Sequence, residues 1–131
     1  MGNQTPSQVI HTESAPKAIG PYSQAIVAGN LVFTSGQIPL DPKTQQIIEG
    51  DIRAQTERVM ENLAAVLQAA GVTFAEVVKA TIFVADLGDF ATVNEIYGKR
   101  FPTNPPARST VQVAALPKGA RVEIDLVAIK K

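Results

Sequence analysis

The sequence predicts one α+β domain in which a mixed β-sheet carries two helices on one of its faces. Segments with a two-residue alternation of apolar and polar side chains are interspersed with segments whose apolar residues recur every three or four positions. The 131 residues, 45% of them hydrophobic, have the size of one globular domain, and no internal repeat or long linker divides them. We therefore treat residues 1–131 as a single domain with the element order β-β-(β)-α-β-α-β-β.

The first part of the chain predicts a hairpin. Ser23–Ala28 and Leu31–Gln37 are short runs rich in apolar and β-branched residues, and Gly29-Asn30 between them suits the positive φ angles of a tight turn. The polar stretch that follows, up to Gly50, has room for a small hairpin around Lys43-Thr44.

A long helix is expected next. Asp51 is a suitable N-cap, and Gly71 suits the left-handed conformation that often ends a helix. The apolar residues between them recur at helical spacing and predict one buried face. They are Ile52, Val59, Leu63, Val66, Leu67 and Ala70.

The next segments predict a capped turn, a central strand and a second helix. Thr73 and Glu76 have the spacing of a capping box, and the β-branched run Val77–Ala85 is typical of a buried strand. Asp89 is the expected N-cap of the second helix, which the prolines after Arg100 should stop. Its apolar residues are Phe90, Val93, Ile96, Tyr97 and Phe101, and the prolines are Pro102, Pro105 and Pro106.

Two final strands, Arg108–Ala114 and Arg121–Ile129, should complete the sheet. In the last one, alternate residues from Val122 are apolar and should meet the helices, whereas Arg121, Glu123 and Asp125 point the other way. Alternation also separates Arg108, Thr110 and Gln112 from Ser109, Val111 and Val113. We expect one sheet face to carry Arg, Thr, Gln and Glu among Phe and Val, a mixture typical of a subunit interface.

Composition excludes several kinds of chemistry. The chain has no Cys and no Trp, and His11 is its single histidine, so a zinc site or a nucleophile activated by histidine lacks its usual groups. We therefore expect no zinc site. His11 and Lys79 lack neighbours that would activate them, which favours a structural or interface role for His11 and a solvent-exposed or interface position for Lys79. Catalysis must use carboxylate, guanidinium, hydroxyl and backbone groups.

Charge and hydropathy narrow the expected partners and location. Twelve Lys and Arg residues balance twelve Asp and Glu residues, which gives no electrostatic reason to expect a nucleic acid. No apolar run approaches the roughly 20 residues of a membrane span, and Met1 to Pro6 lacks the features of a signal segment. We expect a cytoplasmic protein without a membrane partner.

Five stretches carry a family resemblance. They are Gly20-Pro21-Tyr22-Ser23-Gln24, Thr34-Ser35-Gly36-Gln37, Asn94 to Tyr97, Pro105 to Thr110, and Arg121-Val122-Glu123-Ile124. In their order, their spacing and the identity of their residues, these stretches resemble the RidA/YjgF family of reactive-intermediate (enamine/imine) deaminases. The resemblance extends along essentially the whole chain.

The resemblance implies a fold, an assembly and an activity. The fold would be like that of bacterial chorismate mutase, assembled as a homotrimer with a ligand cleft between each pair of subunits. The activity would be hydrolysis of 2-imino acids, such as 2-iminopropanoate and 2-iminobutanoate, to 2-oxo acids and ammonia. These substrates arise from enamines that pyridoxal-phosphate enzymes release. The resemblance also implies that no metal and no organic cofactor is used.

The resemblance also assigns roles to single residues. The family's carboxylate-binding arginine falls on Arg108, and a planar guanidinium grips a carboxylate through two parallel hydrogen bonds. Glu123 matches the acidic residue associated with the hydrolytic water, and a carboxylate suits that proton transfer. Without the motif, Arg108 could equally well be one member of an ion pair at a subunit interface. Glu123 could be an ordinary exposed residue of a strand.

The remaining candidates are cleft residues. Tyr22 and Ser35 match the family's tyrosine and serine hydroxyls, which would help to orient water and imine. Gly36 lets the backbone approach a ligand closely, and Asn94 matches an asparagine on the second helix. Thr110 is expected in the binding site, but it stands where family members often have cysteine, so thiol chemistry is excluded there.

Two other functions remain open. A non-catalytic protein that binds a 2-oxo acid or another small metabolite would use the same Arg108 cleft. A ribonuclease or translation inhibitor is less favoured, because the chain combines zero net charge with few aromatic residues for RNA stacking.

Overall fold

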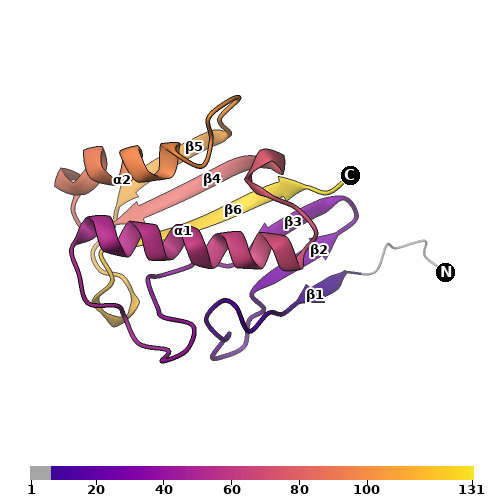
Figure 1. Cartoon of the computed structure of the whole chain (residues 1–131), viewed down its shortest axis with the longest axis horizontal. Helices are drawn as coiled ribbons and strands as arrows, with labels where there is room; N and C mark the ends of the chain where they lie inside the picture. Colours follow the sequence, from indigo (N-terminus) through magenta and orange to yellow (C-terminus); the bar gives the residue numbers. More distant parts are fainter. Residues whose placement is uncertain (1–6) are drawn as a thin grey trace.

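The computed structural model describes residues 7–131, so the expectation for Met1 to Pro6 lies outside the described residues. Six strands form one sheet in the order β1-β2-β3-β6-β4-β5 (Figure 1). All neighbouring strands pair antiparallel except β4 and β5, which are parallel, so the sheet is mixed as predicted. The strands are β1 (Gln8–Ile10), β2 (Ala25–Ala28), β3 (Leu31–Thr34), β4 (Val77–Val84), β5 (Ala107–Gln112) and β6 (Val122–Ile129).

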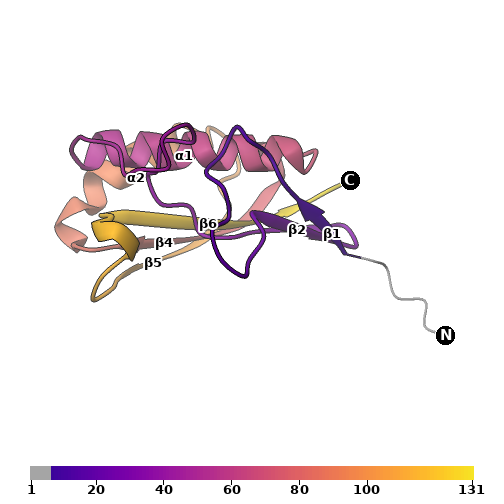
Figure 2. The ribbon, with the colours of Figure 1, turned by 90° about the horizontal axis from the view of Figure 1, so that it is seen from below.

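Both helices, α1 (Ile52–Ala69) and α2 (Phe90–Gly98), cover the same face of the sheet (Figure 2). The predicted α+β arrangement is therefore confirmed. The expected alternation along β6 explains it, because every second residue of that strand is almost fully buried against the helices. These residues are Val122, Ile124, Leu126 and Ala128.

The first hairpin forms with shorter strands than predicted. Gly29 has a φ of 62° in the two-residue turn between β2 and β3, and Ala28 pairs with Leu31. The chain leaves the sheet after Thr34 and returns at Gln37, which forms a single bridge with Ile124. Ser35 and Gly36 therefore lie in a short excursion beside β6.

Two sheet elements differ from the prediction. Strand β1 was not expected, because its three residues include two exposed ones and give no clear alternation. The turn around Lys43-Thr44 forms, but only one bridge, Leu40 with Ile47, flanks it, so no strand of the sheet is added.

Helix α1 follows its sequence signals closely. The Asp51 side chain accepts a hydrogen bond from the Ala54 amide at 2.9 Å, and Gly71 has a φ of 85° just after the helix. The predicted apolar residues are buried. Asn62 is also fully buried, and its side-chain amide donates a hydrogen bond to the Leu40 carbonyl at 3.0 Å. This bond satisfies the buried amide and ties the polar excursion to the helix.

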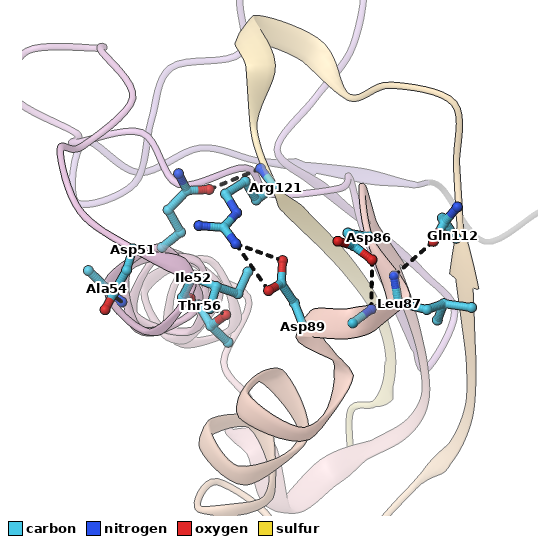
Figure 3. Close-up of polar contacts among 11 residues, drawn as sticks. Asp51, Ile52, Ala54, Thr56, Asp86, Leu87, Asp89, Gln112 and Arg121 are labelled. Carbon is cyan, nitrogen blue, oxygen red and sulfur yellow. Dashed lines mark hydrogen bonds and ion pairs between the residues drawn. The ribbon is translucent and has the colours of Figure 1, made fainter.

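Asp89 occupies the expected N-cap position of α2, but the expected capping by its side chain is wrong. Asp89 makes no capping hydrogen bond, because its carboxylate accepts two hydrogen bonds from Arg121 Nη2, both at 3.0 Å (Figure 3). The capping role falls on Asp86, which accepts from the Gly88 amide in a short 3-10 turn before the helix. The Asp89–Arg121 ion pair instead ties the start of α2 to the residue before β6.

The expected common face for Arg108, Thr110 and Glu123 is also wrong. Arg108 pairs with Ala80 and Thr110 with Ile82, and both β4 residues are buried beneath the helices. Glu123 pairs with Phe83 and points away from the helices. Arg108 and Glu123 therefore lie on opposite faces of the sheet within one chain. Alternation shows which residues of one strand share a face, but only the pairing of β5 with β4 and of β4 with β6 relates the faces of different strands.

Candidate functional site

A cavity of about 520 Å³ opens on the face of the sheet that the helices leave uncovered. It lies where the excursion after β3 meets the start of β6. We call it the Glu123 cavity. Gly36 lines it together with the polar residues Lys17, Tyr22, Ser35, Gln37, Lys118 and Glu123. Four of the predicted site residues are thus brought together.

Glu123 supplies the carboxylate of this cavity. Partial burial, and secondly the negative charge of Asp125 on the same face of β6, raise the pKa of Glu123 above its ordinary value. No ion pair holds its carboxylate among residues 7–131, where the two salt bridges are Arg53–Glu95 and Asp89–Arg121. A carboxyl group with a raised pKa takes up and returns a proton nearer neutral pH than an ordinary glutamate does.

Gly36 fixes where the Glu123 carboxylate lies. A Cβ on Gly36 would lie 2.8 Å from Cδ and 3.0 Å from Cγ of Glu123, and closer still to Oε2. Any side chain at position 36 would therefore displace the carboxyl group. Glycine is needed here to keep the carboxyl group in this position, through close packing and not through a positive φ.

We expect Gly36→Ala to fold but to lose the observed position of Glu123. The carboxyl group must rotate away from the added methyl group, so its pKa should fall toward the ordinary value as it becomes more exposed. Carbon-13 NMR titration of the Glu123 carboxyl measures this shift. Gly98→Ala is the matched control because open space surrounds a Cβ there, and an unchanged Glu123 pKa in both variants would contradict the assignment.

Two hydroxyl groups border the cavity in different ways. Ser35 Oγ donates to the Ser23 carbonyl, so it holds the incoming loop and leaves only acceptor capacity toward a ligand. Tyr22 is 52% exposed, and its hydroxyl accepts from the Ile19 amide at 3.3 Å, which leaves its own proton free to donate.

Gln24 anchors the loop that presents Tyr22, a role that the sequence analysis did not identify. Its buried side chain accepts from the Thr12 amide at 2.7 Å and donates to the carbonyls of Thr12 at 3.0 Å and Pro16 at 2.7 Å. One side chain thereby satisfies three backbone groups of an irregular segment. A glutamine beside a strand gives no sequence signal for this.

The other predicted residues form a second group, on the helix-covered face at the edge strand β5. Arg108 Nη1 donates to Asn94 Oδ1 of α2 at 2.6 Å. Both residues line a pocket of about 430 Å³, together with Tyr97, Pro105 and Pro106. We call this the Arg108 pocket, and its one charged side chain gives it the capacity to bind an anion.

Thr110 lies on the same face as Arg108, two residues further along β5. Its hydroxyl is buried without a hydrogen-bond partner in the described part of the chain. It does not line either pocket, so its expected place in the binding site stays a prediction.

The two groups divide the chemistry of the site. The Glu123 cavity offers a carboxylate, a tyrosine hydroxyl and two lysines, and the Arg108 pocket offers a guanidinium. Across residues 7–131, no three His, Asp or Glu side chains come together as a metal site would require. The described chain likewise contains no helix long and apolar enough to cross a membrane.

Comparisons with known proteins cover nearly the whole chain. The family described as Endoribonuclease L-PSP matches residues 12–130. Protein DfrA of Myxococcus xanthus is 61% identical over 124 residues, which cover 93% of this chain and 95% of that protein. The 2-iminobutanoate/2-iminopropanoate deaminase of Homo sapiens is 49% identical over 123 residues, which cover 94% and 90%.

A solved structure gives the same result for the fold. Escherichia coli TdcF, determined with bound serine, superimposes with a TM-score of 0.89 at 43% identity and covers 95% of this chain and 99% of that one. Serine carries a carboxylate beside an amino group, which are the two polar ends of an amino acid.

Proposed function

The chain belongs to the Endoribonuclease L-PSP family, which includes the Rid and RutC proteins, and from this premise we propose that it hydrolyses 2-imino acids to 2-oxo acids and ammonia. Small imines such as 2-iminopropanoate and 2-iminobutanoate are the proposed substrates. The human relative that is 49% identical is named for them.

The observation that carries the proposal is the placement of Glu123. Its carboxylate lines a cavity large enough for a small imino acid, its pKa is raised by burial, and Gly36 leaves the space that it occupies. A general base needs this combination of access, restraint and a pKa nearer neutral. Tyr22 supplies a hydroxyl on the same wall.

The proposed reaction uses only proton transfer and positioning. The substrate is the protonated imine, and Glu123 takes a proton from water as the water oxygen attacks the C=N carbon and the π electrons move to nitrogen. Glu123 then returns this proton to the amino nitrogen of the resulting carbinolamine. The C–N bond breaks and ammonia leaves with its electron pair, while Glu123 removes the hydroxyl proton as the C=O bond forms and passes that proton to the ammonia. Orientation of water and imine supplies much of the acceleration, since a protonated imine carbon is already electrophilic.

We further propose that each site is completed by a second copy of the chain. Lys17 and Lys118 line the Glu123 cavity, but a lysine cannot bind a carboxylate through two parallel hydrogen bonds as an arginine can. Arg108 lies on the face opposite Glu123 in its own chain. Arg108 of a neighbouring subunit would then close the Glu123 cavity. The cyclic homotrimer implied by the family resemblance, with the chorismate mutase-like fold, provides such a heterologous contact at every interface.

The uncovered sheet face supports association. Phe33 and Val111 point to this face and are 42% and 41% exposed, and Phe83 lies on the same side between Val111 of β5 and Glu123 of β6. Large apolar side chains grouped on a sheet face favour contact with another protein surface over contact with water. Sedimentation of the purified protein tests this, and a 13.9 kDa monomer would contradict it.

Hydrolysis of the imine can be measured with a substrate that is generated in situ. A threonine dehydratase releases an enamine that becomes 2-iminobutanoate, and semicarbazide captures the imine before it hydrolyses. We expect the protein to raise 2-oxobutanoate formation and to lower capture in proportion to its concentration. If the ratio of hydrolysis to semicarbazide capture is the same with and without the protein, the proposed function is wrong.

The pH dependence of turnover should follow Glu123. The base must be ionised, so kcat/KM should fall on the acid side, around a pKa above that of an ordinary glutamate. Asp125→Asn removes the neighbouring negative charge, which favours ionisation and lowers the pKa of Glu123. We expect the acid limb to move to lower pH. An identical profile would show that Asp125 does not act on the base.

RNA cleavage is a second candidate, because the matched family is described as an endoribonuclease. A metal-independent ribonuclease usually needs a general base, a general acid and cations along the phosphate chain. His11 is exposed beyond β1, and the Glu123 cavity is small beside a nucleic-acid strand. If the protein cleaves single-stranded RNA and Glu123→Gln abolishes the cleavage, this candidate is favoured. If the protein binds a 2-oxo acid but neither hydrolyses imines nor cleaves RNA, a non-catalytic binding protein is favoured.

A further inference from the structure

The guanidinium of Arg108 rests on three side chains of one helix face. Phe90, Asn94 and Tyr97 occupy positions i, i+4 and i+7 of α2, so they point in nearly the same direction. The Arg108 Cζ atom lies 5.5 Å from the ring centroid of Phe90 and 5.1 Å from that of Tyr97. Asn94 Oδ1 accepts from Nη1 at 2.6 Å.

All three contacts hold the guanidinium without cancelling its charge. A ring face attracts a cation through its quadrupole, and the Asn94 amide is neutral. No carboxylate of residues 7–131 comes within ion-pair distance of Arg108. Two other arginines of this part of the chain do form ion pairs, Arg53 with Glu95 and Arg121 with Asp89. Arg108 is therefore oriented while its charge remains available.

From this geometry we propose that Phe90 and Tyr97 are positioning residues for Arg108, and that with Asn94 they form a neutral cradle that keeps the guanidinium free for an anionic substrate. The proposal rests on the carboxylate-binding role of Arg108 in the proposed function. An ion pair would orient the side chain equally well, but the substrate would then have to compete with a permanent carboxylate.

The Tyr97 ring, and not its hydroxyl, carries this role. The ring is 4% exposed and packs on Phe101 at 4.7 Å between centroids. Its hydroxyl is buried without a hydrogen-bond partner in the described chain. Burial raises the pKa of Tyr97 while Arg108 opposes that rise, so the hydroxyl stays neutral. Tyr97→Phe should therefore preserve the cradle.

The structure provides a matched control for the rings. Arg100 lies over the Phe74 ring, with Cζ 5.2 Å from the centroid, outside both pockets. Phe90→Leu and Phe74→Leu each remove one ring beneath an arginine. If the cradle positions Arg108, only Phe90→Leu should raise KM for 2-iminobutanoate, by about five-fold with kcat changed less than two-fold, the worth of one cation–π contact.

Neutrality is tested at Asn94. Asn94→Asp keeps an acceptor at the same place but adds a charge, whereas Asn94→Ala only removes the hydrogen bond. We expect Asn94→Asp to raise KM at least ten-fold and more than Asn94→Ala does. If Asn94→Asp binds substrate as tightly as the wild type, the requirement for a neutral cradle is wrong.

A readout independent of turnover separates this proposal from the proposed function. Nitrogen-15 relaxation of the Arg108 Nε–H group reports how rigidly the guanidinium is held in the intact protein, with or without an active imine hydrolase. We expect an ordered group in the wild type, Tyr97→Phe and Phe74→Leu, and a mobile one in Phe90→Leu. Equal order in Phe90→Leu and Phe74→Leu would overturn the cradle.

Discussion

Replacing Arg108 with alanine should lower kcat/KM for 2-iminobutanoate by about a hundred-fold, mostly through KM, because the substrate carboxylate loses its cation. Truncating one member of a hydrogen-bonded charge pair in a desolvated site costs about 2–5 kcal/mol. Arg108→Lys should recover only part of the loss, since an ammonium group cannot bind a carboxylate through two parallel bonds or lie flat on the rings of Phe90 and Tyr97.

A surface arginine controls for the loss of charge. Arg53 is exposed and pairs with Glu95 of α2 at 3.2 Å. Arg53→Ala changes the net charge by the same amount and disturbs the same helix, but it touches neither pocket. Equal kinetics in Arg53→Ala and Arg108→Ala would mean that Arg108 does not bind the substrate.

Replacing Glu123 with glutamine should lower kcat by about a hundred-fold or more, because general-base catalysis contributes roughly 10²–10⁴-fold and the amide cannot accept the proton. The side chain keeps its shape in the space beside Gly36, so KM should change little. Single-turnover kinetics on 2-iminobutanoate separate the two constants. Full activity in Glu123→Gln would remove the carboxylate from the mechanism.

The same substitution should stabilise the fold at neutral pH. The pKa of Glu123 is raised in the folded chain, so the native state holds its proton more tightly and loses stability as the pH rises through that pKa. Glutamine cannot ionise, so it avoids this loss. We expect Tm to be higher than in the wild type at pH 7, and equal at acid pH, where the carboxyl group is protonated in the folded and the unfolded chain. A lower Tm at pH 7 would contradict the burial of an ionised group.

Local signals made most of the fold predictable. Asp51 and Gly71 bounded α1 correctly, and alternation along β6 identified its buried face, since caps and side-chain periods depend on residues close in sequence. Asp89 misled the prediction because a distant residue, Arg121, takes its carboxylate. Strand β1 is too short to give a period.

The candidate site was predictable as a set of residues but not as an arrangement. Family motifs selected Tyr22, Ser35, Gly36 and Glu123, which do line one cavity. They also selected Arg108, but alternation within its own strand could not place it relative to Glu123, because β6 and β5 are joined only through β4. The motifs also selected Asn94, but Phe90 and Tyr97 were assigned to the core because their spacing is that of any buried helix face.

Subunit mixing tests the central claim, that one site takes Glu123 from one chain and Arg108 from another. Arg108→Ala and Glu123→Gln chains with different tags are co-refolded in equal amounts, and native mass spectrometry verifies the mixed assemblies. Each parent alone should be nearly inactive. Random assembly gives both intact groups to about one quarter of the interfaces in a cyclic oligomer, so the account predicts about one quarter of wild-type turnover. Mixed assemblies that remain as inactive as their parents would contradict it.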